Sequence, residues 1–408
     1  MLWIVGHAFR DIRDYLDSHA IAYGVLTNKN LPKKPVLATV RTASLDYSSP
    51  DALRRSAAAA KLDTTALLAA GYENYVLPAA ILAEQFNVPG LSLEAAEATT
   101  DKAVMRAKFQ AYNPAISPDF ALVSSWQDAE AFATSHQFPI MLKPTNLMKS
   151  LYITKNNSLD ELRANYQATA EALQHTNDTI YTMYPPRIIV EECMAGTMHT
   201  VAGFADAAGQ PHLCNQIVDC ITGQDVGKNE NYIYSRQLPS TLGAAQAEAV
   251  LEVARQGVRA LGLTSTMLHI EIMLTADGPK IIEIGARIGG YRTRMYSHAT
   301  GIDMNHMMLA VAAGDTPKIN TTSNRPIAVI ELFPDAEGAF VAVANADAIA
   351  GLPSLRHFSV KAKPGQPVGR SSHGYKAAAV VILGHHDTTQ FERDMAYVRS
   401  RVQVRVRP

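Results

Sequence analysis

Acidic side chains lie within strongly apolar runs in the segment 271–294, which reads EIMLTADGPKIIEIGARIGGYRTR. If TADGP forms a five-residue hairpin loop, Leu274 pairs with Lys280, and counting outward puts Glu271 opposite Glu283 on one sheet face. Facing carboxylates repel, so this pairing predicts a cation between them or a raised pKa on one of them. Magnesium, which binds one or two carboxylates plus nucleotide phosphates, fits such a pair. A loop of even length would instead direct the two glutamates to opposite faces, with one of them solvated.

An arginine- and glycine-rich stretch, ARIGGYRTR, follows the second of these glutamates. Gly289 and Gly290 would let backbone N–H groups approach an anion, while Arg292 and Arg294 add positive charge. Arg287 offers a planar fork for a carboxylate or phosphate, which suits an acyl-phosphate step. The segment therefore predicts an anion cradle, and a glycine turn with solvated arginines is the alternative.

A lysine ends the apolar strand predicted over FPIMLKP. The ammonium of Lys143 should emerge from a buried strand, where a phosphate is its expected partner. The following loop, TNLMKS, offers Asn146, Lys149 and Ser150 in place of a glycine-rich phosphate loop. An ordinary surface lysine remains the alternative.

Two further polar positions lie on predicted strands. RIIVEECM puts Glu191 and Glu192 at a strand end, where backbone groups could bind a purine ring; a charged strand end is the simpler interpretation. His269 lies two residues before Glu271 and therefore on the same strand face, within reach of a substrate. A hydrogen-bonded structural histidine is the alternative, because no metal-ligand spacing such as HExxH accompanies it.

The elements that must position these residues form four units along the chain. Residues 1–93 open with short β-branched runs, among them MLWIVG and the VLATV ending at Val40, spaced as in βαβ units, followed by alanine-rich helical patterns over 56–93. Residues 94–194 alternate helices and strands, and Thr99 and Thr100 are expected to cap the helix DKAVMRAKFQAY. Residues 195–315 contain longer antiparallel strands. Residues 316–408 predict a small C-terminal α+β unit.

Composition narrows the function classes. The 408 residues include 37 Lys and Arg against 38 Asp and Glu, a net charge of −1, so no long-range field would attract nucleic acid or an anionic membrane. Three cysteines are too few for a disulfide framework or a four-ligand zinc site. Neither a signal peptide nor an apolar run of roughly 20 residues is present. These features favour a soluble, cytoplasmic protein.

Taken in order, six residues resemble the signature of the ATP-grasp superfamily over roughly 93–315: Lys102, Lys143, Glu191, Glu271, Glu283 and Arg287. The resemblance implies an ATP-grasp fold of mixed α/β and α+β class, preceded by an N-terminal βαβ domain. It also implies an ATP-dependent carboxylate–amine ligase that uses Mg²⁺, with Mn²⁺ as an alternative metal, and by analogy a homodimer.

The resemblance assigns roles to particular residues. It implies that Lys102, Lys143 and Ser150 contact the phosphates, and that Glu191, Glu192 and Met194 form the adenine hinge. Glu271 and Glu283 are the expected metal ligands, and Arg287, Lys143 and Gly290 the expected catalytic groups. His269, Arg287, Gly289, Gly290 and Arg292 are the expected substrate contacts, and residues 94–194 include a lid over the site.

Within the superfamily, HIE before the hairpin and EIGARIGG after it are similar to the L-amino-acid ligases, which join two amino acids into a dipeptide. Two positions depart from the common pattern. Gly285 stands where many members have an asparagine that helps to hold the metal. Met198 stands where several relatives offer a glutamate to the ribose, a role that would then pass to His199. A carboxylase or purine-pathway ligase, and a non-catalytic nucleotide-binding protein, are the alternative functions.

Overall fold

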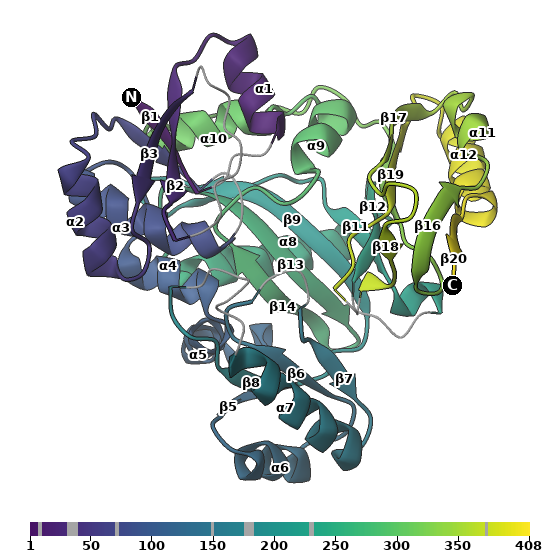
Figure 1. Cartoon of the computed structure of the whole chain (residues 1–408), viewed down its shortest axis with the longest axis horizontal. Coiled ribbons are helices and arrows are strands. Elements are labelled where there is room, and N and C mark those ends of the chain that lie inside the picture. Colours follow the sequence, from purple (N-terminus) through teal and green to yellow (C-terminus); the bar gives the residue numbers. More distant parts are fainter. Residues whose placement is uncertain are drawn as a thin grey trace.

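The computed structural model describes residues 1–6, 10–30, 40–69, 73–147, 151–174, 183–227, 232–371 and 374–408. Among these residues helices and strands alternate, as the sequence predicts, and the chain forms four sheets (Figure 1). No helix in the described ranges is both long and apolar enough to cross a membrane.

The N-terminal unit contains a parallel four-stranded sheet in the order β3-β2-β1-β4. Its elements are β1 (Leu2–Val5), α1 (Arg10–Ser18), β2 (Tyr23–Asn28), β3 (Arg41–Leu45), α2 (Pro50–Ala59), β4 (Ala66–Leu68), the 3₁₀ turn η1 (Glu73–Tyr75) and α3 (Val76–Phe86). The predicted βαβ pattern is thus confirmed. One detail differs: within the region 56–93, where helical patterns were expected, β4 is a short strand whose three buried residues pair with β1. Most of the predicted strand VLATV lies outside the described residues.

The second unit contains an antiparallel sheet in the order β5-β8-β6-β7, with α6 and α7 beside it (Figure 1). Its elements are α4 (Leu93–Thr100), α5 (Lys102–Tyr112), η2 (Pro114–Ile116), β5 (Phe120–Val123), α6 (Trp126–Ser135), β6 (Ile140–Pro144), β7 (Thr154–Asn156), α7 (Leu159–Gln174) and β8 (Ile188–Glu192). The predicted cap of α5 was wrong. Thr99 and Thr100 end α4, and the carboxylate of Asp101 instead accepts hydrogen bonds from the N–H groups of Ala103 and Val104, because Asp101 is the residue with extended backbone at this junction.

The largest sheet runs in the order β14-β13-β9-β11-β12-β15-β19-β17, with β10 paired to β9. Its first part comes from β9 (Thr197–Ala205), β10 (Pro211–Leu213), β11 (Val218–Thr222), η4 (Gln224–Val226), β12 (Ile233–Leu238), β13 (Thr266–Thr275) and β14 (Gly278–Gly285), with the helices α8 (Ala244–Leu261), α9 (Arg292–Thr300) and α10 (Met304–Ala312). The apolar side of α8 packs with α5 against β13 and β14 through Phe109, Val258, Ile270 and Ile281. This packing fixes the hairpin that carries the two paired glutamates.

The C-terminal residues extend the same sheet across the predicted boundary at 315. They form β15 (Ile327–Leu332), β16 (Gly338–Val343), α11 (Ala346–Ala350), β17 (Leu355–Val360), β18 (Pro367–Val368), β19 (Ala379–Gly384), α12 (Thr388–Arg401) and β20 (Val404–Arg407). β15 pairs with β12, while β16, β18 and β20 make a separate small sheet. The C-terminal region is therefore an α+β unit that shares its main sheet with the preceding one.

Candidate active site

The β13–β14 hairpin brings Glu271 directly opposite Glu283, as predicted. The predicted loop was wrong, however. Leu274 pairs with Pro279, so the turn is shorter than five residues, and a bulge between Glu271 and Ile272 shifts the register back by one residue. The tighter turn and the bulge cancel, which is why the carboxylates face each other despite the incorrect loop.

The two carboxylates have different surroundings. Oε1 of Glu271 lies 3.3 Å from Nε2 of His269, and Oε2 of Glu283 lies 3.3 Å from Nζ of Lys102. Burial raises the pKa of Glu283, and the nearby carboxylates of Glu73 and Glu271 add to this effect against the influence of Lys102. Burial acts in the same sense on Glu271, but the hydrogen bond from His269 and nearby cations leave its pKa below the ordinary value. Of the two expected consequences of the pairing, these surroundings favour a raised pKa on one partner, Glu283.

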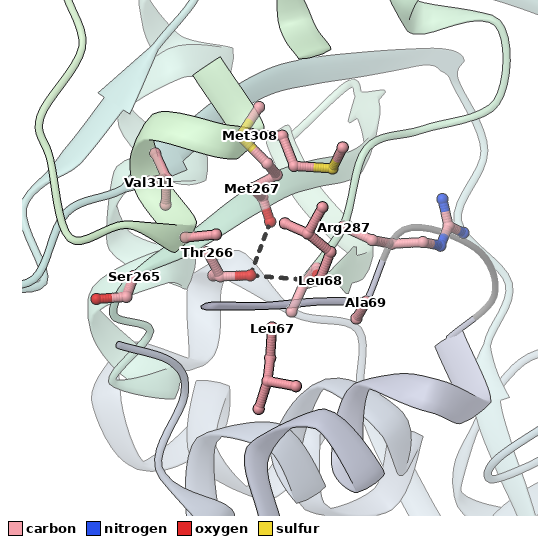
Figure 2. Close-up of a pocket in the computed structure, with 11 residues that line it drawn as sticks. Leu67, Leu68, Ala69, Ser265, Thr266, Met267, Arg287, Met308 and Val311 are labelled. Atoms are coloured by element: carbon pink, nitrogen blue, oxygen red, sulfur yellow. Dashed lines mark hydrogen bonds between the residues drawn. The ribbon is translucent and has the colours of Figure 1, made fainter. Parts of the chain in front are cut away.

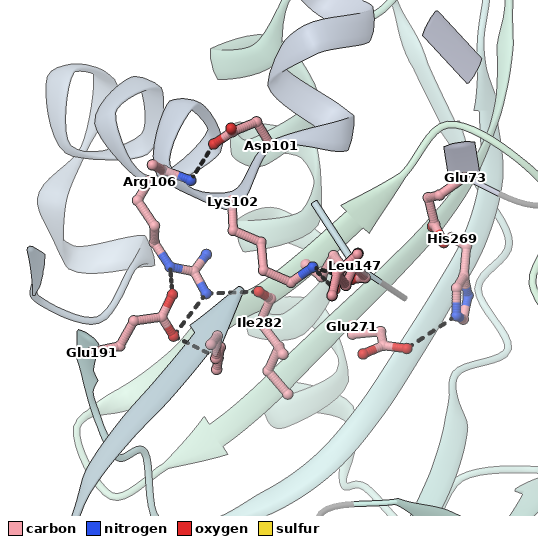
Figure 3. A network of polar contacts seen from close by, with 12 residues as sticks. Glu73, Asp101, Lys102, Arg106, Leu147, Glu191, His269, Glu271 and Ile282 are labelled. Atoms are coloured by element: carbon pink, nitrogen blue, oxygen red, sulfur yellow. Dashed lines mark hydrogen bonds and ion pairs between the residues drawn. The ribbon is translucent and has the colours of Figure 1, made fainter. Parts of the chain in front are cut away.

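Lys102 is fixed between the second unit and the hairpin. It is the first residue of α5, its backbone N–H donates to the carbonyl oxygen of Thr145, and its ammonium donates to the carbonyl oxygen of Leu147 at 3.2 Å. Figure 3 shows the side chain extending from the helix towards the hairpin. An ammonium carries three donors, so donor capacity remains for an anion beside Glu283.

Lys143 and Glu191 form a buried ion-pair network together with Arg106. Nζ of Lys143 lies 2.5 Å and Nε of Arg106 lies 2.9 Å from the carboxylate of Glu191, which is wholly buried. Arg106 also donates to the carbonyl oxygen of Ile282, the extra residue of the bulge, at 2.7 Å. Burial alone would raise the pKa of Glu191, but the two cations lower it to about 2. The Glu191 carboxylate is thus occupied by internal partners (Figure 3).

The predicted adenine hinge directly follows β8. Glu192 ends the strand, its carboxylate lies 3.3 Å from Nζ of Lys280, and its backbone N–H bonds the carbonyl oxygen of Asp119. Met194 is half-buried in the segment between β8 and β9. The hinge therefore offers backbone groups and the Met194 side chain for contact with a ring, since the carboxylates of Glu191 and Glu192 both have partners.

The predicted ribose side of the site is closed by internal hydrogen bonds. His199 is almost fully buried, with Nδ1 2.9 Å from Oδ1 of Asp219 and Nε2 2.7 Å from the hydroxyl of Thr197. Met198 packs in an apolar cluster. Both ring nitrogens of His199 have partners in the protein, so the geometry provides no support for a ribose contact.

The residues of the predicted anion cradle do not all face the same site. Nη2 of Arg287 lies 2.8 Å from Oε2 of Glu73, whereas its Nε is buried and has no hydrogen-bond partner among the described residues. Gly290 is exposed, with open space where a side chain would begin. Arg292 is turned inward: its guanidinium is buried and donates to the hydroxyl of Thr200 at 2.6 Å.

The remaining predicted residues also lie in different settings. Arg294 pairs with Asp11 of α1 at 2.7 Å. A Cβ added to Gly289 would lie 2.5 Å from Nδ1 of His269, so this glycine makes room for the histidine ring. Asn146 donates to the carbonyl oxygen of Tyr184, while Ser150 and Lys149 lie outside the described residues.

A small pocket lies next to the backbone end of Arg287, between β4, α10 and the β13–β14 pair (Figure 2). Its lining is mostly apolar and comprises Leu67, Leu68, Ala69, Ser265, Thr266, Met267, Ala286, Arg287, Met308, Val311 and Ala312. Figure 2 shows the Arg287 side chain extending away from the apolar side chains. The arginine thus separates an apolar space from the charged part of the site.

Two residues of the site were not predicted from the sequence. Arg106 lies four positions after Lys102 on α5, and this spacing puts both cations on one helix face, a signal that was available. Glu73 lies in the N-terminal unit, more than 200 positions from Arg287, and no local pattern marks it. Within the described part of the chain, no three His, Cys, Asp or Glu side chains form a ready-made metal cluster. A metal at Glu271 and Glu283 would therefore need ligands from a bound molecule.

Comparison with known proteins agrees with this geometry. Residues 136–295 match the family model of the ATP-grasp domain. The structure resembles that of an L-amino acid ligase from Bacillus licheniformis, with a TM-score of 0.83 and 16% sequence identity over 100% of this chain and 98% of that one. The protein therefore contains an ATP-grasp domain and has the ATP-grasp fold.

Curated relatives indicate an ATP-dependent ligase. The chain is 26% identical to an alanine–anticapsin ligase of Bacillus subtilis over 60% of this chain and 54% of that protein. It is also 26% identical to a phosphoribosylamine–glycine ligase of Methanobrevibacter smithii, over 49% of this chain and 47% of that protein. The matches span about half the length of both ligases.

Proposed function

We propose that this protein joins a carboxylic acid to an amine in an ATP-dependent reaction that passes through an acyl phosphate and releases ADP and phosphate. The observation that carries the proposal is the placement of Lys102 and Arg287 beside a pair of facing carboxylates. Lys102 lies 3.3 Å from Glu283, Glu283 pairs with Glu271, and Arg287 follows the same strand. Cations next to a carboxylate pair suit a nucleotide triphosphate and its metal.

The residues present fit a magnesium nucleotide. Glu271 and Glu283 are oxygen donors of the kind that magnesium prefers. Burial, and then the neighbouring carboxylates of Glu73 and Glu271, raise the pKa of Glu283, and a divalent cation would offset this negative charge. When bound, magnesium supplies positive charge that neutralises the transferring phosphoryl group. Lys102 and Lys143 hold the phosphates, and the segment 192–194 contacts the adenine ring. Manganese fits the same oxygen ligands.

The chain's own groups then carry the chemistry. The substrate carboxylate lies beside Arg287, whose guanidinium retains N–H donors beyond those bonded to Glu73 and Ile288. A carboxylate oxygen attacks the γ-phosphorus of ATP, ADP departs, and Arg287 and Lys143 stabilise the charge on the phosphoryl oxygens. An amine attacks the acyl carbon, and phosphate leaves with the former carboxylate oxygen. Backbone N–H groups at the exposed Gly290 face this step.

Amino acids are the substrates that we propose. The HIE and RIGG segments resemble L-amino-acid ligases, the alanine–anticapsin ligase is a curated relative, and the structure of an L-amino acid ligase covers the whole chain. The product would then be a dipeptide. His269 lies between Glu271 and Gly289, where its ring borders the proposed substrate site. A homodimer in the cytoplasm remains our prediction.

A purine-pathway ligase is the second candidate, favoured by the similarity to phosphoribosylamine–glycine ligase. Both candidates use an amino acid carboxylate or a related acid, but their amine differs: a second amino acid in one case and a phosphorylated ribosylamine in the other. A non-catalytic nucleotide-binding protein is the third candidate, and it would bind ATP without joining an acid to an amine. Gly285 and Met198, which depart from the common pattern, would be explained by this candidate if the protein shows no turnover.

The test is release of ADP and phosphate from magnesium ATP across a matrix of single and paired amino acids, with mass spectrometry of the products. We expect release that requires a pair and yields a dipeptide mass. Product with glycine and phosphoribosylamine alone would favour the second candidate. Binding of ATP without consumption under any pairing would support the non-catalytic alternative.

A further inference from the structure

Glu73 connects the N-terminal unit to the candidate active site. It begins the short turn η1, and its Oε2 accepts a hydrogen bond from Nη2 of Arg287 at 2.8 Å. The two side chains are largely shielded, with 14% and 18% of their surfaces exposed. A carboxylate and a guanidinium this close, with limited access to solvent, hold each other's position more firmly than a surface pair. The N-terminal unit thus restrains the arginine on which the proposed chemistry depends.

The same carboxylate fills the space beside Gly285. A Cβ built on Gly285 would meet Oε1 of Glu73 at a separation shorter than real Cβ contacts allow. Any side chain at position 285 would therefore displace Glu73. Glu73 and a side chain at 285 are therefore alternative occupants of one volume.

The position of Glu73 also leaves the arginine ready for a ligand. Nη2 of Arg287 is taken by Glu73 and Nη1 by the carbonyl oxygen of Ile288, at 2.9 Å. Three N–H donors remain, and the one on Nε is buried and has no partner in the described part of the chain. Two fixed contacts thus orient the planar fork while further donors stay free for a ligand. Electrostatic influence of Glu73 reaches both Arg287 and Glu283, which places its charge next to the reacting groups.

We propose that Glu73 occupies, from the N-terminal unit, the place of a side chain at position 285, and that it is a positioning residue for Arg287. This inference rests on the proposed ligase function for its kinetic part. The oxygen acceptor beside Arg287 then comes from a distant part of the sequence, and the absence of a side chain at position 285 leaves room for it. The N-terminal unit would then complete the active site.

The experiment compares Glu73→Ala, Gly285→Asn and the double variant by steady-state kinetics and thermal unfolding. Glu73→Ala should lower kcat about tenfold or more and leave the KM for ATP within about twofold, because Arg287 loses its restraint while the nucleotide contacts stay. Gly285→Asn alone should lower both kcat and the melting temperature, since the asparagine and Glu73 compete for one volume. In the double variant, the asparagine's carbonyl oxygen takes the vacated place, and kcat should return to within about threefold of wild type.

Glu84→Ala is the matched control, because Glu84 is a carboxylate of the same unit that pairs with Arg54 at 2.7 Å on an exposed surface. It should leave kcat unchanged. A kcat of Glu73→Ala equal to that of the wild type would overturn the inference. Additive effects of the two substitutions on the melting temperature would also overturn the inference. If the two side chains share one volume, Gly285→Asn must lower the melting temperature less when Glu73 is absent.

Melting temperatures are measured without substrate, so they test the role of Glu73 independently of the proposed ligase function. If the wild-type protein forms no amide with any amine, the proposed function fails and the coupling between positions 73 and 285 decides the inference: coupling supports it and additivity overturns it. If the wild type turns over but Glu73→Ala does so equally well, the function stands and the inference is overturned.

Discussion

Two carboxylate centres lie on either side of the candidate active site, and they differ in how fully the protein satisfies them. Glu191 is wholly buried between Arg106 and Lys143, and its pKa falls to about 2. Glu283 faces another carboxylate, has Lys102 at 3.3 Å, and has a raised pKa. In the first centre the Glu191 carboxylate has both of its cationic partners within the protein, and Lys143 keeps further N–H donors for a phosphate. The second carries negative charge that a bound cation would offset, so the first is expected to hold the site together and the second to bind.

Substitution of Glu283 should have the largest effect on turnover. Glu283→Ala removes one of two facing oxygen donors and should lower magnesium-dependent ADP release by at least about a hundredfold. Because Glu271 and Glu283 repel each other, the free energy of unfolding should stay within about 1 kcal/mol of wild type. Turnover assays and denaturant unfolding measure the two quantities. Glu248→Ala, on an exposed face of α8, is the control, and near-normal ADP release by Glu283→Ala would contradict the metal assignment.

Substitution of Glu191 should show the reverse pattern. Glu191→Ala leaves the buried cations of Arg106 and Lys143 without their shared partner, and we expect a loss of about 3–5 kcal/mol in the free energy of unfolding. Urea denaturation checks this value. Glu192→Ala is the matched control, since Glu192 is the next residue on the strand and its ion pair with Lys280 is partly exposed. Equal stability of the two variants would remove the distinction between the centres.

Arg287 should affect the chemical step more than nucleotide binding. Arg287→Ala removes a cation from beside the acyl phosphate and should lower amide formation by about a hundredfold or more. Binding of ADP, measured by calorimetry, should change little because the proposed phosphate contacts come from Lys102 and Lys143. Full product formation by this variant would make the arginine structural.

The depressed pKa of Glu191 predicts acid sensitivity. A carboxyl whose pKa is lower in the folded state contributes stability above its unfolded-state pKa, and this contribution disappears as pH falls towards the folded-state value of about 2. Wild type should therefore lose stability below about pH 4.5 more steeply than Glu191→Gln, which has no titrating group there. Parallel stability curves for the two proteins between pH 5 and about pH 3 would contradict this assignment.

Substitutions of the adjacent Gly289 and Gly290 should differ in stability by the smallest amount. Gly289→Ala puts a Cβ 2.5 Å from the His269 ring and should destabilise the fold by about 1–3 kcal/mol, whereas a Cβ at Gly290 meets nothing within 4 Å. Gly290→Ala should fold like wild type, so any change in its turnover reports on the exposed backbone near the reaction. Thermal unfolding of both variants checks the difference, and equal melting temperatures would contradict the close packing of Gly289 against the histidine ring.

The sequence predicted the fold and the order of the site residues better than their contacts. Short apolar and β-branched runs identified β6, β8, β13 and β14, because strands buried in a sheet contain mostly apolar residues. The facing of Glu271 and Glu283 was predicted through an incorrect loop, since a bulge at Ile282 has no sequence signature and restored the register.

The contacts that were missed join distant segments. Glu191 was predicted at an adenine site, but the structure surrounds its carboxylate with Arg106 and Lys143, and its role towards the nucleotide stays a prediction. Glu73 reaches Arg287 from another unit. Such pairs depend on how whole sheets pack, and local spacing carries no information about them.

The most direct test of the central claim follows an oxygen atom from the acid substrate. An amino acid whose carboxylate is labelled with ¹⁸O is supplied with magnesium ATP and an amine, and the released phosphate is analysed by mass spectrometry. Attack of the carboxylate on the γ-phosphorus predicts one labelled oxygen transferred to inorganic phosphate for each amide formed. Amide formation with unlabelled phosphate, or with release of AMP and pyrophosphate, would contradict the acyl-phosphate mechanism.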